Sequence, residues 1–135
     1  MNKPKNVLKT LLRVLLGVLI TLVVLAGCMA AFVLVGKEKT LSLAHGGVTP
    51  LSVSDGTYTG HYSGFRWSNT VEVTVQDHEM ITIRQTKPQV FAKEETIQTL
   101  VDRVLAAQST DVDAVSGATA DSNAFFAALE DALTP

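Results

Sequence analysis

An apolar stretch of 22 residues without a charge, from Val14 to Val35, constrains this chain more than any other feature. At 1.5 Å of rise per residue, such a helix is roughly 33 Å long and can cross the hydrocarbon core of a bilayer. Four cations and no acid precede it, and only one net positive charge follows at once in Lys37-Glu38-Lys39. The positive-inside rule therefore predicts a single-pass helix in a cell membrane, with the N-terminus cytoplasmic and the rest of the chain extracytoplasmic.

The one cysteine, Cys28, leaves a second interpretation of this segment open. Leu25-Ala26-Gly27-Cys28 resembles the lipobox of bacterial lipoproteins, in which the signal segment is removed and the cysteine is lipidated. The residues after it, Met29 to Val35, stay apolar where lipoproteins usually turn polar. An uncleaved anchor is the leading interpretation, and Cys28 lipidation is the alternative. Both place the remaining residues outside the cytoplasm.

A chain of 135 residues has room for the anchor and one further domain. We expect an anchor or lipoprotein-type signal over 1–36, a linker over 37–54 with breakers at Gly46, Gly47 and Pro50, and a domain over 55–135. From residue 40 onward five cations oppose twelve acids, so the net charge is about −7. Such an acidic domain repels phosphate backbones, so we expect membrane lipid and no nucleic acid among its partners.

Alternating residues in the domain predict three strands, followed by helical periodicity. Strands are expected over 57–64, around Val71-Val73-Val75, and over 80–86 with Ile81 and Ile83 facing inward. One apolar helical face comprises Ile97, Leu100, Val101, Val104 and Leu105. A second helix is expected over 122–133, with Ser122 as its N-cap and with Phe125, Phe126, Leu129 and Leu133 toward the core. The predicted fold is α+β: an antiparallel β-meander packed against two helices, preceded by the transmembrane helix.

The segment Asp113-Ala114-Val115-Ser116-Gly117-Ala118-Thr119 has the residues that attachment of a group to a hydroxyl would need. Thr119 supplies the oxygen, and its neighbours Ser116, Gly117 and Ala118 are small enough to admit a bulky phosphate. Gly117 can adopt a positive φ and turn the chain sharply. Because a helix follows, its N-terminal dipole and free N–H groups would favour an anion there.

This segment resembles the flavinylation motif of the FMN-binding domain family, which includes subunits of the sodium-translocating NADH:quinone oxidoreductase and of Rnf complexes. The resemblance implies FMN joined through its phosphate to Thr119, attached by a flavin transferase that uses FAD. It also implies that Asp113 is a recognition carboxylate or helps to hold a metal–FAD donor, and that Ser116, Gly117 and Ala118 belong to the cofactor site. Many members carry a hydroxyl residue two places after the threonine, where this chain has Asp121, whose charge would repel a phosphodiester.

The resemblance implies a bacterial membrane-anchored electron carrier, in which covalent FMN performs the redox chemistry, rather than a free-standing enzyme. Its donor would be quinone-linked or an NADH dehydrogenase. A non-redox surface binding module and a flavin-dependent reductase subunit are the alternatives. Tyr62, Phe65 and Trp67 are candidates either for stacking on a flavin ring or for ordinary core packing. The sequence offers no arrangement for catalysis by side chains and no metal-ligand spacing.

Overall fold

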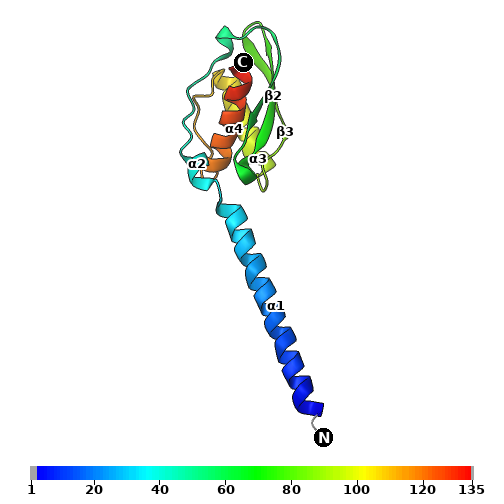
Figure 1. The fold of residues 1–135 in the computed structure, drawn as a ribbon. Helices are drawn as coiled ribbons and strands as arrows, with labels where there is room; N and C mark the ends of the chain where they lie inside the picture. Colours follow the sequence, from blue (N-terminus) through cyan, green and yellow to red (C-terminus); the bar gives the residue numbers. More distant parts are fainter. Residues whose placement is uncertain (1–2, 135) are drawn as a thin grey trace. The chain divides into compact units, whose positions relative to one another are not determined.

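The computed structural model describes residues 3–134, in two units that meet between Leu34 and Val35. The first unit contains the single helix α1, Lys3–Leu34, which has 32 residues (Figure 1). A window of 18 residues within the N-terminal helical segment has a mean hydropathy of 2.9, so α1 is long and apolar enough to cross a membrane. The helix is continuous through its two interior glycines, Gly17 and Gly27.

The second unit is built on a three-stranded antiparallel sheet in the order β1-β2-β3. The strands are β1, Gly56–Tyr62; β2, Asn69–Gln76; and β3, Glu79–Lys87. Val71, Val73 and Val75 are fully buried on one face of β2, as their period of two predicts. Tyr58 and Tyr62 of β1 pack against the same core. The predicted meander is confirmed.

The hairpin between β2 and β3 turns without glycine. Asp77 and His78 both adopt a positive φ, at 53° and 62°, which is the backbone conformation of a type I′ turn. Aspartate and histidine enter this region more readily than most residues that carry a Cβ.

The inward orientation predicted for Ile81 is wrong. The β2–β3 register shifts between Thr74 and Val75 of β2, so that Val75 pairs with Met80 whereas Thr74 pairs with Thr82. Ile81 falls in this bulge and is 48% exposed, while Met80 and Ile83 face the core. A β-bulge places two residues opposite one and so changes the side to which the following side chains point.

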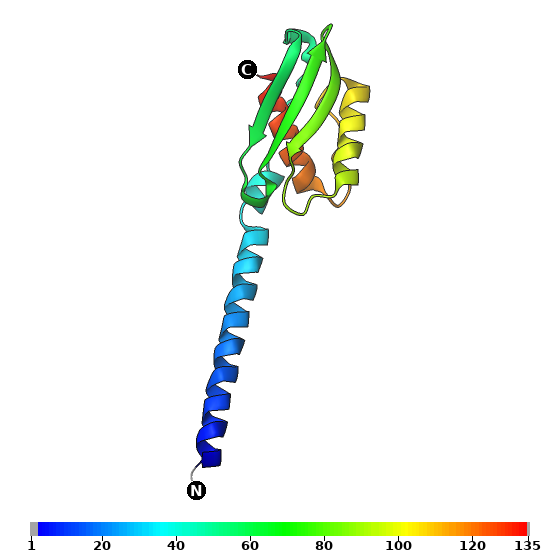
Figure 2. The same ribbon diagram turned by 90° about the vertical axis from the view of Figure 1, so that its right-hand side faces the viewer.

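Two long helices, α3 (Glu94–Ala107) and α4 (Thr119–Leu133), cover the same face of the sheet (Figure 2). Of the predicted apolar face of α3, Ile97, Leu100, Val101 and Val104 are buried and Leu105 is partly buried, and all four predicted core residues of α4 are buried. The α+β fold is therefore confirmed. The N-cap assignment of Ser122 is wrong, because α4 begins at Thr119 and its cap position is Ala118. The Ser122 hydroxyl instead donates to the Ala118 carbonyl within the first turn, at 2.8 Å.

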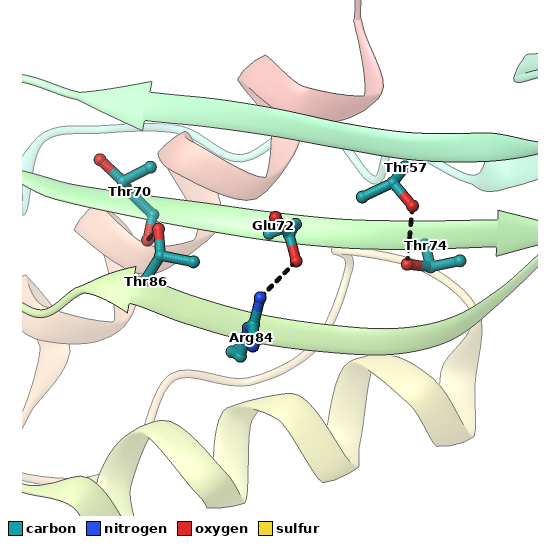
Figure 3. A network of polar contacts seen from close by, with 6 residues as sticks. All are labelled: Thr57, Thr70, Glu72, Thr74, Arg84 and Thr86. Carbon is teal, nitrogen blue, oxygen red and sulfur yellow. Dashed lines mark hydrogen bonds and ion pairs between the residues drawn. The ribbon is translucent and has the colours of Figure 1, made fainter.

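The opposite face of the sheet is open and polar (Figure 3). There Arg84 forms an ion pair with Glu72 at 2.7 Å, and the hydroxyls of Thr57 and Thr74 share a hydrogen bond of 3.2 Å. An antiparallel sheet commonly leaves one face in solvent, and the polar side chains on this face are suited to contact with water.

The segment 37–54, predicted as a linker, is part of the folded unit rather than a free tether. It contains α2 (Lys37–Leu41) and the 3-10 turn η1 (Pro50–Ser52), and a second 3-10 turn, η2 (Phe65–Trp67), follows β1. Thr40 is fully buried, and the amide of Asn123 on α4 donates to its carbonyl at 3.2 Å. Gly46 N–H donates to Glu130 on α4 at 2.8 Å. Polar and breaker composition suggested a tether, but tertiary hydrogen bonds with α4 override it.

The contact between β1 and α4 depends on Gly60. A Cβ at this position would lie 2.0 Å from the Ala128 carbonyl oxygen and 2.3 Å from the Ala132 nitrogen. Both are backbone atoms, so only a shift of the whole helix could relieve the clash. Glycine at this position lets the backbones of strand and helix approach closely.

We predict that Gly60→Ala destabilises the protein by about 3 kcal/mol, at the upper end of overpacking costs. Urea unfolding of the full chain in detergent micelles measures the difference. Gly46→Ala is the matched control, because a Cβ there meets nothing within 4 Å. Equal unfolding midpoints for the two variants would contradict the close approach of α4 to β1.

Candidate functional site

Thr119 is the first residue of α4, and its side chain is exposed. The chain reaches it through a tight turn in which Ala118 N–H donates to the Val115 carbonyl at 2.9 Å. Gly117 adopts φ 78° in this turn, as its position in the motif predicts. The Ser122 hydroxyl accepts from Val115 N–H at 3.0 Å and so fixes the turn to the first turn of the helix. The hydroxyl of Thr119 is therefore held at a defined place and stays accessible.

The start of α4 favours an anion. Ala118, at the cap position, has no side chain that could accept from the first N–H groups of the helix. These N–H groups and the helix dipole create a partial positive charge at Thr119. A phosphate attached there would meet backbone donors without displacing a capping side chain.

An open pocket of about 410 Å³ adjoins Thr119. It brings together three segments that are far apart in the sequence: the start of α2, η2 and the start of α4. Its lining residues are Lys37, Leu41, Arg66, Trp67, Gly117, Ala118, Thr119, Ala120 and Asp121. Two cations, two apolar side chains and the carboxyl of Asp121 therefore line the pocket beside the hydroxyl.

Arg66 sets the electrostatics of the pocket. Its guanidinium lies over the Trp67 ring at 3.9 Å and opposes the charge of Asp121. Burial raises the pKa of Asp121, while Arg66 and then the Trp67 indole N–H lower it. Desolvation is the largest of the three causes, so the carboxylate remains costly to ionise even beside a cation.

Two buried polar atoms at this pocket have no hydrogen-bond partner among residues 3–134: Trp67 Nε1 and Asp121 Oδ1. The indole N–H lies near enough to Asp121 to affect its pKa, but the two atoms do not meet hydrogen-bond geometry. A buried donor without a partner costs free energy, so it favours a ligand that supplies an acceptor.

A buried amide network holds the loop after β3 against the start of α4. Gln89 donates to the Asp121 carbonyl at 2.8 Å and accepts from Gln85 at 2.9 Å. Gln85 also donates to Asn69, whose amide donates to the Ala124 carbonyl at 2.9 Å. Because every link involves a directional donor and acceptor, the network fixes the first turn of α4 relative to the sheet.

The structure places the predicted site residues at three separate locations. Gly117, Ala118 and Thr119 line the pocket, and Ser116 is exposed in the turn beside them. Asp113 lies apart, in a separate depression beside Arg103, which donates to the Asp113 carbonyl at 2.7 Å. Cys28 is exposed on α1.

The sequence did not identify Lys37, Leu41 or Arg66 as part of the site, since only tertiary contact brings them to Thr119. Of the three aromatic candidates, Trp67 is fully buried and Phe65 is exposed. Tyr62 is half-buried, and its hydroxyl shares a hydrogen bond with Thr40 at 3.0 Å.

Because the pKa of Asp121 is higher in the folded protein than its ordinary value of 3.8, ionisation of this group costs stability. The loss appears as the pH rises through the raised pKa and is absent below 3.8. We predict that Asp121→Asn is more stable than the parent at pH 7 and equal to it near pH 3.5. Urea titrations of both proteins at the two pH values measure this, with the exposed Glu79→Gln as control. A constant difference at both pH values would contradict the prediction.

Comparison with curated proteins finds no match to this chain. A protein-family model described as the FMN-binding domain matches residues 64–134, which is more than half of the chain. The matched residues include η2, β2, β3, α3, α4 and the whole Asp113–Thr119 motif. The chain therefore belongs to the FMN-binding domain family.

Proposed function

We propose that the protein is a membrane-anchored, extracytoplasmic electron carrier with FMN joined to Thr119 by a phosphoester bond. The observation that supports this most directly is the exposed Thr119 hydroxyl at the start of α4, in a pocket that also contains Lys37 and Arg66. The helix N-terminus and the two cations together suit a phosphodiester.

The charge of Asp121, two residues after the attachment point, is the main obstacle to this proposal. Arg66 opposes that charge, and burial raises the pKa of the carboxyl. Both effects reduce the repulsion that an attached phosphate would meet. Asp121 is thus compatible with a phosphoester in this fold.

The pocket also fits the flavin ring. Leu41, which is 42% exposed, offers apolar surface, and the buried Trp67 indole N–H in the pocket wall is a donor that still lacks an acceptor. When bound, FMN accepts and donates one or two electrons, and the protein contributes its position and environment. The residues of the pocket would cover one side of the ring, because the pocket is open to solvent.

Attachment requires a second protein, which we propose to be a flavin transferase that uses FAD. Thr119 Oγ1 would take the FMN phosphoryl group from FAD, its hydroxyl proton would leave to a base, and AMP would be released. Asp113 is exposed outside the pocket, where such an enzyme could recognise it without displacing the cofactor. The electron donor would be a quinone-linked carrier or an NADH dehydrogenase in the same membrane.

We expect Thr119→Val to abolish covalent flavin and Thr119→Ser to retain it, because only the serine keeps the nucleophilic oxygen. The full chain is produced together with an active flavin transferase, denatured, and analysed by intact mass and flavin fluorescence. Ser52→Ala, at an exposed serine in η1 outside the motif and the pocket, is the control for loss of a hydroxyl and keeps the adduct. An adduct that persists in Thr119→Val, or its absence from the parent protein, would refute the attachment.

Arg66→Gln should lower the initial rate of adduct formation about fivefold, which corresponds to ~1 kcal/mol of lost charge compensation. Adding Asp121→Asn should restore most of this rate, since the uncompensated carboxylate is then removed. The exposed Lys93→Gln controls for loss of a cation elsewhere. If the double variant is as slow as Arg66→Gln, Arg66 does not act by opposing Asp121.

A further inference from the structure

Three large apolar side chains are exposed on two neighbouring loops of the folded unit. Phe65 in η2 is 68% exposed, and Val90 and Phe91 in the loop after β3 are 44% and 65% exposed. The loops are joined by two hydrogen bonds: Val90 N–H to the Arg66 carbonyl at 2.8 Å, and the Arg66 guanidinium to the Val90 carbonyl at 3.2 Å. We call Phe65, Val90 and Phe91 the apolar rim.

The backbone at both phenylalanines is unusual. Phe65 has φ 55° and Phe91 has φ 66°, in the left-handed region that favours glycine. Phe91 occupies the third position of a turn closed by a hydrogen bond from Ala92 N–H to the Gln89 carbonyl at 3.3 Å. Glycine would fit this turn without strain. Neither ring is buried, so core packing does not compensate for the strained backbone, which points to a role at the surface.

Chain connectivity fixes where the rim can lie. A Cβ at Gly36 would lie 2.7 Å from Phe65 Cδ2, so the ring of Phe65 lies directly against Gly36. Gly36 follows the last residue of α1, Leu34, by two positions, which is at most about 7 Å of chain. Phe65 therefore contacts a residue that follows α1 by only two positions in the chain. In Figures 1 and 2, η2, the loop after β3 and α2 lie at one end of the folded unit, and η1 lies at the other.

We propose that the apolar rim inserts into the interfacial region of the bilayer that α1 spans. Phenylalanine and valine side chains are stabilised on entering this region, and the segment Lys37-Glu38-Lys39 adds one net positive charge that suits anionic head groups. The inference rests on the membrane anchoring in the proposed function. Arg66, which belongs to η2 beside the apolar rim, and Lys37 of α2 both line the pocket beside Thr119. The inference therefore adds that Thr119 is held at the bilayer surface. A lipid-soluble electron carrier could then reach the cofactor without leaving the membrane.

The test uses the full chain with Cys28→Ala, in nanodiscs of phosphatidylcholine and phosphatidylglycerol. A spin label is placed at Val90→Cys, and its accessibility to oxygen is compared with that to a water-soluble nickel complex. Leu51→Cys is the matched aqueous control, because Leu51 is an exposed apolar residue, 74% accessible, in η1. Val23→Cys on α1 is the membrane control. We expect an oxygen-to-nickel ratio at Val90 several-fold above that at Leu51, falling to the Leu51 value when Phe65→Ser and Phe91→Ser are added.

The other possible results each contradict a different part of the proposal. A ratio at Val90 equal to that at Leu51, with Val23 in lipid, overturns the insertion and leaves the anchor intact. A high ratio that survives the two serine substitutions overturns the role of the phenylalanines. Water exposure at Val23 overturns the anchoring and, with it, the insertion. Repeating the measurement in Thr119→Val separates insertion from cofactor attachment, because we expect the ratio to persist without flavin. Phe91→Ser alone provides the comparison if the double substitution lowers the unfolding midpoint.

Discussion

The close packing of α4 against β1 is the contact on which the rest of the folded unit depends. Gly60 allows the helix backbone to approach the strand, and the fully buried Phe125, Phe126 and Leu129 then fill the space above the sheet. Because α4 begins at Thr119, its seating on the sheet also determines where that hydroxyl lies. A contact in the C-terminal half of the helix, at Ala128 and Ala132, thus helps to position the Thr119 hydroxyl at its N-terminal end.

Polar groups inside the unit complete this positioning. The Asn69–Gln85–Gln89 network ends on the Asp121 carbonyl, and Asn123 holds the carbonyl of Thr40. Both links reach the first two turns of α4 from segments far away in the sequence. Hydrophobic packing alone would allow small sliding of the helix, whereas satisfied buried amides restrict it to one register. The pocket beside Thr119 therefore has walls that are fixed from several directions.

Local sequence patterns predicted the features that arise from local physics. The alternation of Val71, Val73 and Val75 predicted a strand, and the small residues before Thr119 predicted the turn at Gly117. Features that depend on tertiary contact could not be predicted in this way. The bulge at Ile81 is set by pairing with β2, and Arg66 reaches the site only because η2 lies beside the start of α4. Likewise, residues 37–54 have the composition of a linker, but their partners Asn123 and Glu130 lie some eighty residues later.

The folding of α2 onto α4 has a consequence for how the site would meet other molecules. With residues 37–54 packed in the folded unit, only Val35 and Gly36 lie between the last residue of α1 and the first residue of α2 in the chain. For a partner in the same membrane, encounter would become a two-dimensional search by lateral diffusion, at a high effective concentration. A soluble partner would gain no such advantage and would have to collide from bulk solution. The proposed electron carrier would therefore favour partners in the same membrane by kinetics, before any specific recognition takes place.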